Sequence, residues 1–395
     1  MLLIIHTTGI LMLSIQLPGC VSNQIYNSSK DKYLSELATP TEETTGVDLA
    51  IIEFDEFGMH WEPQQLEDTL KLIHSRNAES SRGIMLVTYT HGWMNNANPD
   101  RENSDLARFR AGMLKLASGL HAEGAPAPDH VIGVYLGWRG ATNRLPAWSF
   151  LSFWDRKNAA ERVASYQMRE TLFRLTDTAK KRPDTKILLS GHSMGGMILA
   201  RTLAPTLSTF LLASGPDGVP VPADLILLQN PALDGLAAFQ LIEYLKRTGA
   251  KAELRHPDGH IEPALGPVIV SVTSEADWVT RVAYPVGQRF QNHSLAFRQD
   301  LGEGLPPQAE MANQAHGHLD FLISHRAYIE NGEIVIEKIP SAYNDTPFWI
   351  VQASEGICRN HGDLYNPKFL RLIETITKMN RLYDTGVQTW ITQAP

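Results

Sequence analysis

From residue 47 onward, short apolar runs alternate with segments whose apolar residues recur every three or four positions. The runs are apolar at nearly every position, which is typical of strands buried on both faces. They predict strands at residues 47–54, 84–90, 131–138, 187–190, 225–229, 268–273 and 348–353. The periodic segments predict helices at residues 63–75, 105–121, 159–181, 194–212, 233–246 and 367–383.

This alternation predicts parallel βαβ units, and therefore an α/β fold with a mostly parallel sheet covered by helices on both faces. We expect one domain over residues 47–385. Residues 290–346 break the alternation, and we interpret them as an insertion that contributes a strand at residues 333–339. A segment rich in Ser, Thr, Lys and Glu predicts a flexible tether at residues 20–46, and residues 386–395 are expected to form a tail.

The composition is that of an ordinary globular protein, with 43% apolar and 20% charged residues among 395. The formal net charge of −8 lacks the basic footprint of a nucleic-acid-binding protein, so no nucleic-acid partner is expected. The two cysteines, Cys20 and Cys358, are too few for a disulfide-stapled scaffold. The sequence predicts no oligomeric state.

Residues 1–19 contain no Asp, Glu, Lys or Arg. An apolar stretch this short is more typical of a signal peptide than of a membrane span. Leu17-Pro18-Gly19-Cys20 resembles the lipobox of bacterial lipoproteins, although Pro18 and the missing basic residues depart from that pattern. The resemblance implies cleavage before Cys20, lipid attachment to Cys20, and a membrane-anchored place in the cell envelope, facing outside the cytoplasm. The alternative is an ordinary secretory signal and a secreted protein.

The hexapeptide Gly191–Gly196 matches the pattern G-x-S-x-G between a predicted strand and a predicted helix. A sharp turn at this place strains the backbone of the central residue and exposes the hydroxyl of Ser193 above the sheet. The alternative is a glycine-rich turn with an idle serine. His192 points away from Ser193 in such a turn, so we interpret it as a packing or surface residue rather than as a base.

The order of a strand ending in Thr-His-Gly-Trp, the GHSMGG motif, a late acid and a final histidine resembles the α/β-hydrolase superfamily, and within it the lipases and esterases. The resemblance covers about residues 47–383. It implies that Ser193 is the nucleophile and that His361, which follows the last predicted strand, is the base. It also implies that Asp277 is the acid, with Glu275 and Asp234 as alternatives.

In that superfamily two backbone amides form the oxyanion hole, which here implies Met194 and Trp93, with Met94 as a substitute for Trp93. The activity implied is cleavage of carboxylic esters through an acyl-enzyme, without a metal or other cofactor. One alternative is a lipase or phospholipase acting on membrane lipid. Another is a non-catalytic surface lipoprotein that retains the fold. The expected partners are an ester or lipid substrate and, through Cys20, a membrane.

Three further features are open to a structural interpretation. The sequence His316-Gly317-His318-Leu319-Asp320 is similar to the metal motif of metallo-β-lactamase-like hydrolases, but Phe321 stands where a histidine is expected, so we interpret these as polar residues of the insertion. The aromatic residues of the segment 138–154 form either the wall of an acyl pocket or the packing of a long connection. Cys358 is expected to be a free thiol beside the loop of His361.

Overall fold

The computed structural model describes residues 23–41, 44–100, 104–122, 127–142, 146–214, 217–302, 304–340, 343–382 and 387–393. The predicted signal peptide and Cys20 lie outside the described residues. No helix among the described residues is long and apolar enough to cross a membrane.

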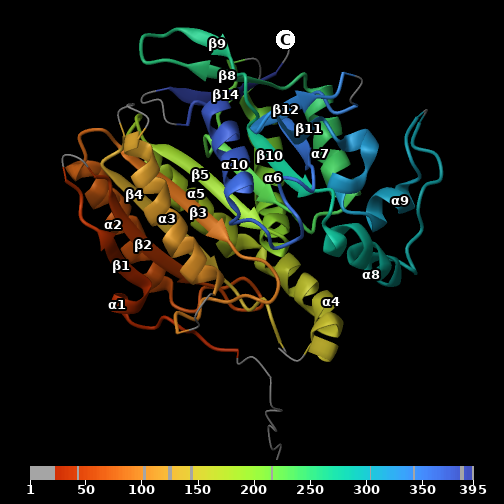
Figure 1. The fold of residues 1–395 in the computed structure, drawn as a ribbon, viewed down its shortest axis with the longest axis horizontal. Coiled ribbons are helices and arrows are strands. Elements are labelled where there is room, and N and C mark those ends of the chain that lie inside the picture. Colours follow the sequence, from red (N-terminus) through yellow and green to blue (C-terminus); the bar gives the residue numbers. More distant parts are fainter. Residues whose placement is uncertain are drawn as a thin grey trace, which may run out of the picture.

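A ten-stranded sheet forms the centre of the described chain, in the order β1-β2-β4-β3-β5-β7-β10-β13-β11-β12 (Figure 1). The strands from β2 to β11 pair in parallel, and only the edge strands β1 and β12 are antiparallel to their neighbours. Their bounds are β1 Leu34–Ala38, β2 Gly46–Glu53, β3 Ile84–Thr90, β4 His130–Gly137, β5 Lys186–His192, β7 Leu225–Gln229, β10 Ile269–Ser274, β11 His325–Glu330, β12 Glu333–Lys338 and β13 Phe348–Ala353.

Helices cover both faces of this sheet. The sheet thus lies between two hydrophobic cores. One core contains side chains from α2 (Pro63–Glu79), α4 (Pro146–Val163), α5 (Tyr166–Lys180), α6 (Met194–Ser214) and α7 (Gly235–Arg247). The other contains side chains from α3 (Asp105–Ala122) and α10 (Pro367–Met379). In β3, Leu86 belongs to the first core while Met85 and Val87 belong to the second, because successive side chains of a strand point to opposite faces. The predicted α/β fold, a mostly parallel sheet with helices on both faces, is confirmed.

The long helix predicted at residues 159–181 is two helices, α4 and α5, and α4 begins thirteen residues earlier than expected (159 − 146 = 13). A second sheet joins β6 (Val219–Pro220), β8 (Lys251–Arg255), β9 (Ile261–Pro263) and β14 (Gln388–Thr392). The prediction of a tail at residues 386–395 is therefore wrong where β14 pairs with β8. The strands β8 and β9 have exposed positions and charged residues, and β14 is polar at three of its five positions, so they lack the continuous apolar runs that marked the central strands.

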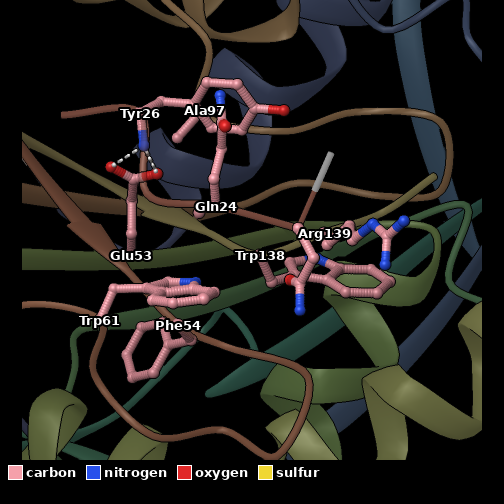
Figure 2. Close-up of a pocket in the computed structure, with 10 residues that line it drawn as sticks. Gln24, Tyr26, Glu53, Phe54, Trp61, Ala97, Trp138 and Arg139 are labelled. Atoms are coloured by element: carbon pink, nitrogen blue, oxygen red, sulfur yellow. Dashed lines mark hydrogen bonds between the residues drawn. The ribbon is translucent and has the colours of Figure 1, made fainter. Parts of the chain in front are cut away.

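The predicted tether at residues 20–46 is wrong for its described part, which packs against the domain. A short helix, α1 (Lys30–Tyr33), leads into β1, which pairs with β2. The backbone amides of Tyr26 and Asn27 donate hydrogen bonds to the buried carboxylate of Glu53, at 3.0 and 2.7 Å. Figure 2 shows the hydrogen bonds between Tyr26 and Glu53 at the edge of a small pocket that Trp61 and Trp138 also line. A polar composition alone does not reveal that a segment has such a buried partner.

The predicted insertion at residues 290–346 adds structure at one edge of the central sheet. It contains α9 (Gln308–Asn313), the 3-10 turns η3 (His316–His318) and η4 (Asp320–Leu322), and the hairpin of β11 and β12. The strand expected at 333–339 is confirmed as β12, whereas β11 was not predicted. Since β11 pairs in parallel with β13, the insertion extends the sheet rather than forming a separate fold.

Candidate active site

Ser193 lies in the sharp turn between β5 and α6. Its φ of 54° is a left-handed conformation that side-chain-bearing residues rarely adopt, as the elbow pattern predicts. Its amide donates to the carbonyl of Gln229 at 2.9 Å, which ties the turn to the end of β7. A Cβ atom at Gly195 would lie 2.0 Å from the carbonyl oxygen of Thr90, so only glycine allows α6 to approach β3 this closely.

The structure brings Ser193, His361 and Asp277 into direct contact. His361 Nδ1 lies 2.7 Å from Asp277 Oδ2, and His361 Nε2 lies 2.8 Å from Ser193 Oγ. Because the carboxylate can only accept, Nδ1 carries the proton and Nε2 accepts the hydroxyl proton of Ser193. The three residues follow β5, β10 and β13, whose carboxyl ends meet at one edge of the sheet.

Asp277 is completely buried, and its carboxylate is held by several donors. Oδ1 accepts from the amides of Val279 at 2.9 Å and Thr280 at 3.2 Å, and Oδ2 accepts from the hydroxyl of Thr280 at 2.6 Å. Burial raises the pKa of Asp277, but the charge of His361 and these hydrogen bonds outweigh it and leave the pKa below its ordinary value. The carboxylate is therefore ionised beside His361.

The two alternative acids are engaged elsewhere. Glu275 Oε1 accepts from the amide of Glu355 at 2.8 Å. Asp234 caps the start of α7 through the amide of Ala237 at 2.8 Å and pairs with Arg201 at 3.1 Å. The structure gives neither carboxylate a hydrogen bond to His361, whereas Asp277 makes one.

His318 and Thr280 extend the hydrogen-bond chain beyond Asp277, which the sequence did not predict. Thr280 gives its one hydroxyl proton to Asp277, so it accepts from His318 Nε2, which lies 2.9 Å away. Burial lowers the pKa of His318 to about 4, so this histidine is neutral. The unusual His316-Gly317-His318 pattern was the sequence feature that could have drawn attention to His318. No feature of the sequence indicated a role for Thr280.

His316 forms two buried hydrogen bonds of its own, separate from those of His318. Its Nδ1 donates to the carbonyl of Leu233 at 3.0 Å, and its Nε2 accepts from the hydroxyl of Ser271 at 2.7 Å. The described histidines and carboxylates whose ligand atoms do gather within 4.8 Å are His256, His260 and Glu262, on the turn between β8 and β9. Glu262 there also contacts Arg381, a cation that disfavours a metal ion at the same oxygen.

The loop that carries His361 is held through its own backbone carbonyl. His192 Nε2 and Asn230 Nδ2 both donate to the carbonyl oxygen of His361, each at 3.0 Å. Asn230 also accepts from the amide of Ser274 at 2.8 Å, so one side chain joins the base loop to the end of β10. Burial and the charge of His361 lower the pKa of His192 to about 3. His192 is thus a buried support of the loop of His361, which is the packing role rather than the surface role that the sequence left open.

The loop after β3 lies against the nucleophile. A Cβ at Gly92 would come within 2.7 Å of the Cβ of Ser193. The amide of Met94 donates to Gly140 at 2.8 Å, which excludes Met94 as an oxyanion donor. His91 fixes the loop: its Nε2 accepts from the amide of Trp138 at 3.0 Å, and its Nδ1 donates to the carbonyl of Gly92 at 2.9 Å. Burial lowers the pKa of His91 to about 4.

The aromatic segment packs as a chain of rings. Phe153 meets Trp93 edge-on at 5.1 Å and Trp154 at 4.7 Å, and Trp154 lies 6.2 Å from Tyr284 of α8 (Tyr284–Gln291). These contacts link the Trp93 loop to α8 and favour the packing interpretation for this part of the segment. Cys358 is a buried free thiol, and burial raises its pKa, so it is a poor nucleophile.

The structure is thus an α/β protein whose mostly parallel sheet holds Ser193, in a strained turn, in contact with His361, which in turn contacts Asp277. No family model matches the chain, and no curated protein matches it. Among solved structures it is similar to Est1E from Butyrivibrio proteoclasticus, with 12% identity, a TM-score of 0.23, and coverage of 51% of this chain and 71% of that one.

Two further similarities are of the same order. Phospholipase PlaB from Legionella pneumophila in complex with thio-NAD has 13% identity and a TM-score of 0.31, covering 76% of this chain and 58% of that chain. An uncharacterized protein from Pseudomonas aeruginosa has 10% identity and a TM-score of 0.27, covering 77% and 46%. Similarities at this level identify neither a family nor a substrate.

Proposed function

We propose that the chain is a serine hydrolase that cleaves carboxylic esters through an acyl-enzyme. The observation that carries this proposal is the continuous hydrogen-bonded series of Ser193, His361 and Asp277, with Ser193 at a φ of 54°. A serine in a relaxed turn, or one without an accepting imidazole, would not support nucleophilic chemistry.

In the proposed reaction, Ser193 Oγ attacks the acyl carbonyl while its proton passes to His361 Nε2. Asp277 keeps the Nδ1 proton in place and stabilises the imidazolium. His361 then gives its proton to the departing alkoxide, which leaves Ser193 acylated. Water attacks the acyl group, its proton goes to His361, and collapse of the second intermediate releases the acid and returns the proton to Ser193.

The backbone amides of Trp93 and Met194 are the proposed donors to the tetrahedral oxyanion. Two observations support them. Met194 begins α6, so its amide belongs to the positive end of a helix. Gly92 places the Trp93 loop against Ser193, and the competing amide of Met94 is already bonded.

Replacing Ser193 tests this proposal directly. Ser193→Ala is expected to lower kcat/KM for p-nitrophenyl butyrate by roughly 10⁴-fold or more, because removing the nucleophile of such a triad leaves only residual catalysis. A fluorophosphonate probe is expected to label the wild type at Ser193 and to leave this variant unlabelled. The matched control is Ser118→Ala, an exposed serine of α3.

Turnover that survives in Ser193→Ala would overturn the proposal. A folded wild type that takes up no fluorophosphonate would favour the non-catalytic lipoprotein instead. A series of esters with increasing acyl length separates the small-ester esterase from the lipase or phospholipase, since only the latter gains activity when substrate forms an aggregate.

We also propose that acylation of Cys20 anchors the protein in the cell envelope. The proposal rests on the lipobox-like residues Leu17–Cys20. Mass spectrometry of the wild type should find the acylated cysteine, and Cys20→Ser is expected to abolish incorporation of a labelled fatty acid into the protein. An unmodified Cys20 in membrane-purified protein would refute it.

A further inference from the structure

An exposed apolar row follows the candidate acid. Trp278, Val282, Val286 and Phe290 are four residues apart and are 61%, 43%, 47% and 76% exposed. They lie along one continuous element, the π-helical turn η2 (Val279–Ala283) and α8, beginning next to Asp277. We call these four residues the outer stripe. Residues with this spacing share one face of a helix, so their exposure is contiguous rather than scattered.

The opposite face of α8 is firmly packed. Tyr284 is buried, and a Cβ at Gly287 would lie 1.5 Å from an atom of the Trp154 ring, so the backbone of α8 rests directly on α4. Gln288 donates to the carbonyl of Ala312 in α9. The element therefore has two apolar faces, and its own domain occupies only one of them.

The charged residues on the segment that carries the outer stripe have one sign. Residues 278–299 contain Arg281, Arg289 and Arg298 and no Asp or Glu, in a chain whose net charge is −8. Arg281 and Arg289 are exposed, and the structure gives neither an ion-pair partner within the described residues. This local excess of arginine, in an otherwise acidic protein, complements a negatively charged surface. The exposed Trp and Phe side chains beside it complement a surface that also has an apolar interior.

The position of the stripe relates it to the candidate active site. Asp277 directly precedes Trp278, and the ring chain through Trp154 and Phe153 connects α8 to the Trp93 loop beside Ser193. Figure 1 draws α8 beside α4 at the lower right of the molecule and β9 at its top. A partner bound to the stripe would thus contact the element that begins directly after Asp277.

We propose that the outer stripe docks on the surface of an anionic phospholipid bilayer. Trp278, Val286 and Phe290 enter the boundary between headgroups and acyl chains, while Arg281 and Arg289 contact lipid phosphates. The proposal goes beyond ester hydrolysis, since docking needs no turnover. It also favours lipids as substrates of the proposed hydrolase, and to that extent it rests on the proposed function.

The test reads out which face of the protein meets the membrane. The full chain carries Cys20→Ser, so that no acyl anchor forms, and Phe290→Cys labelled with an environment-sensitive fluorophore. Vesicles of phosphatidylglycerol and phosphatidylcholine are expected to shift the emission to the blue and to protect the label from iodide. The matched control carries the label at Leu265→Cys, since Leu265 is 78% exposed and apolar but follows β9.

The expected outcome is a shift at position 290 and none at position 265. Adding Val286→Gln should raise the lipid concentration for half-maximal shift by about tenfold, and vesicles of pure phosphatidylcholine should raise it further. No shift at 290, an equal shift at both positions, or a stripe that is covered by a second copy of the chain without lipid would overturn the proposal. Turnover of soluble p-nitrophenyl butyrate, measured alongside, reports separately on the proposed function.

Discussion

The histidines that support Ser193 are kept neutral by burial. His91, His192 and His318 have pKa values lowered to about 4, 3 and 4, mainly by burial. Asp277, by contrast, is held ionised. None of these three histidines therefore carries a positive charge that would compete for the carboxylate of Asp277. That carboxylate is left to stabilise a positive charge on His361, the residue that would be protonated during catalysis.

The hydroxyl of Thr280 is expected to act as a positioning group for Asp277. Thr280→Val removes the 2.6 Å hydrogen bond to Asp277 and leaves His318 Nε2 without its acceptor. Because a hydrogen bond to a charged group is worth about 1.5–3 kcal/mol, kcat for p-nitrophenyl butyrate should fall roughly ten- to hundredfold with little change in KM. Thr280→Ser restores the hydroxyl and should restore kcat. A folded Thr280→Val variant with wild-type kcat would exclude this role.

The sequence predicted the contacts of Ser193, Asp277 and His361, because a motif and the order of strands were enough to place them. It did not predict Thr280, Asn230 or the role of His192. Those residues act through side-chain or carbonyl contacts that exist only once β5, β7, β10 and the loop after β13 meet. The spacing of residues along the chain does not show which side chains come into contact when these elements pack together.

The strands that the sequence predicted correctly are those with a nearly unbroken run of apolar residues. The strands β3, β7 and β13 have the bounds that were predicted, since both of their faces are buried or nearly so. Strands β8 and β11 mix buried and exposed positions, β1 has no buried position, and β14 mixes buried and half-buried ones. Such short uneven runs do not distinguish a strand from a loop.

The contact between α8 and α4 is expected to tolerate no side chain at position 287. Gly287→Ala places a Cβ inside the ring of Trp154, so the helices must separate, which should lower the free energy of unfolding by about 1–3 kcal/mol. Gly112→Ala is the control, because a Cβ there meets no atom within 4 Å in helix α3 and should stabilise by about 0.5–1 kcal/mol. Urea denaturation measures both. Equal stabilities for the two variants would mean that α8 is not seated on Trp154.

At the scale of the whole molecule, buried neutral histidines make the fold sensitive to acid. His91, His192, His316 and His318 have pKa values of about 3 to 4 in the folded state, against about 6.5 when unfolded. The unfolded chain thus binds more protons between those values, so stability falls as the pH drops from about 6.5 toward 4. Asp105, whose pKa is raised to about 6, and Glu53, whose pKa is also raised, both mainly by burial, act in the opposite direction but are fewer than the histidines.

The free energy of unfolding at pH 5 is therefore expected to be lower than at pH 7 by about 2 kcal/mol or more. Guanidinium titrations at the two pH values measure it. His316→Gln should remove part of the difference in the free energy of unfolding between the two pH values, because a glutamine side chain does not bind a proton in this range. A chain that is equally stable at both pH values would contradict the buried, neutral state of these histidines.

The two outer strands of the central sheet have a consequence for how the protein behaves at high concentration. β1 is short and its register with β2 is interrupted between Glu36 and Ala38. β12 begins with Glu333 and ends with Glu337 and Lys338. A bulge on one side and charges on the other obstruct the addition of a foreign strand, which is the first step of edge-to-edge aggregation. By placing β12 outermost, the hairpin of the insertion keeps the apolar strand β13 from ever becoming an open edge.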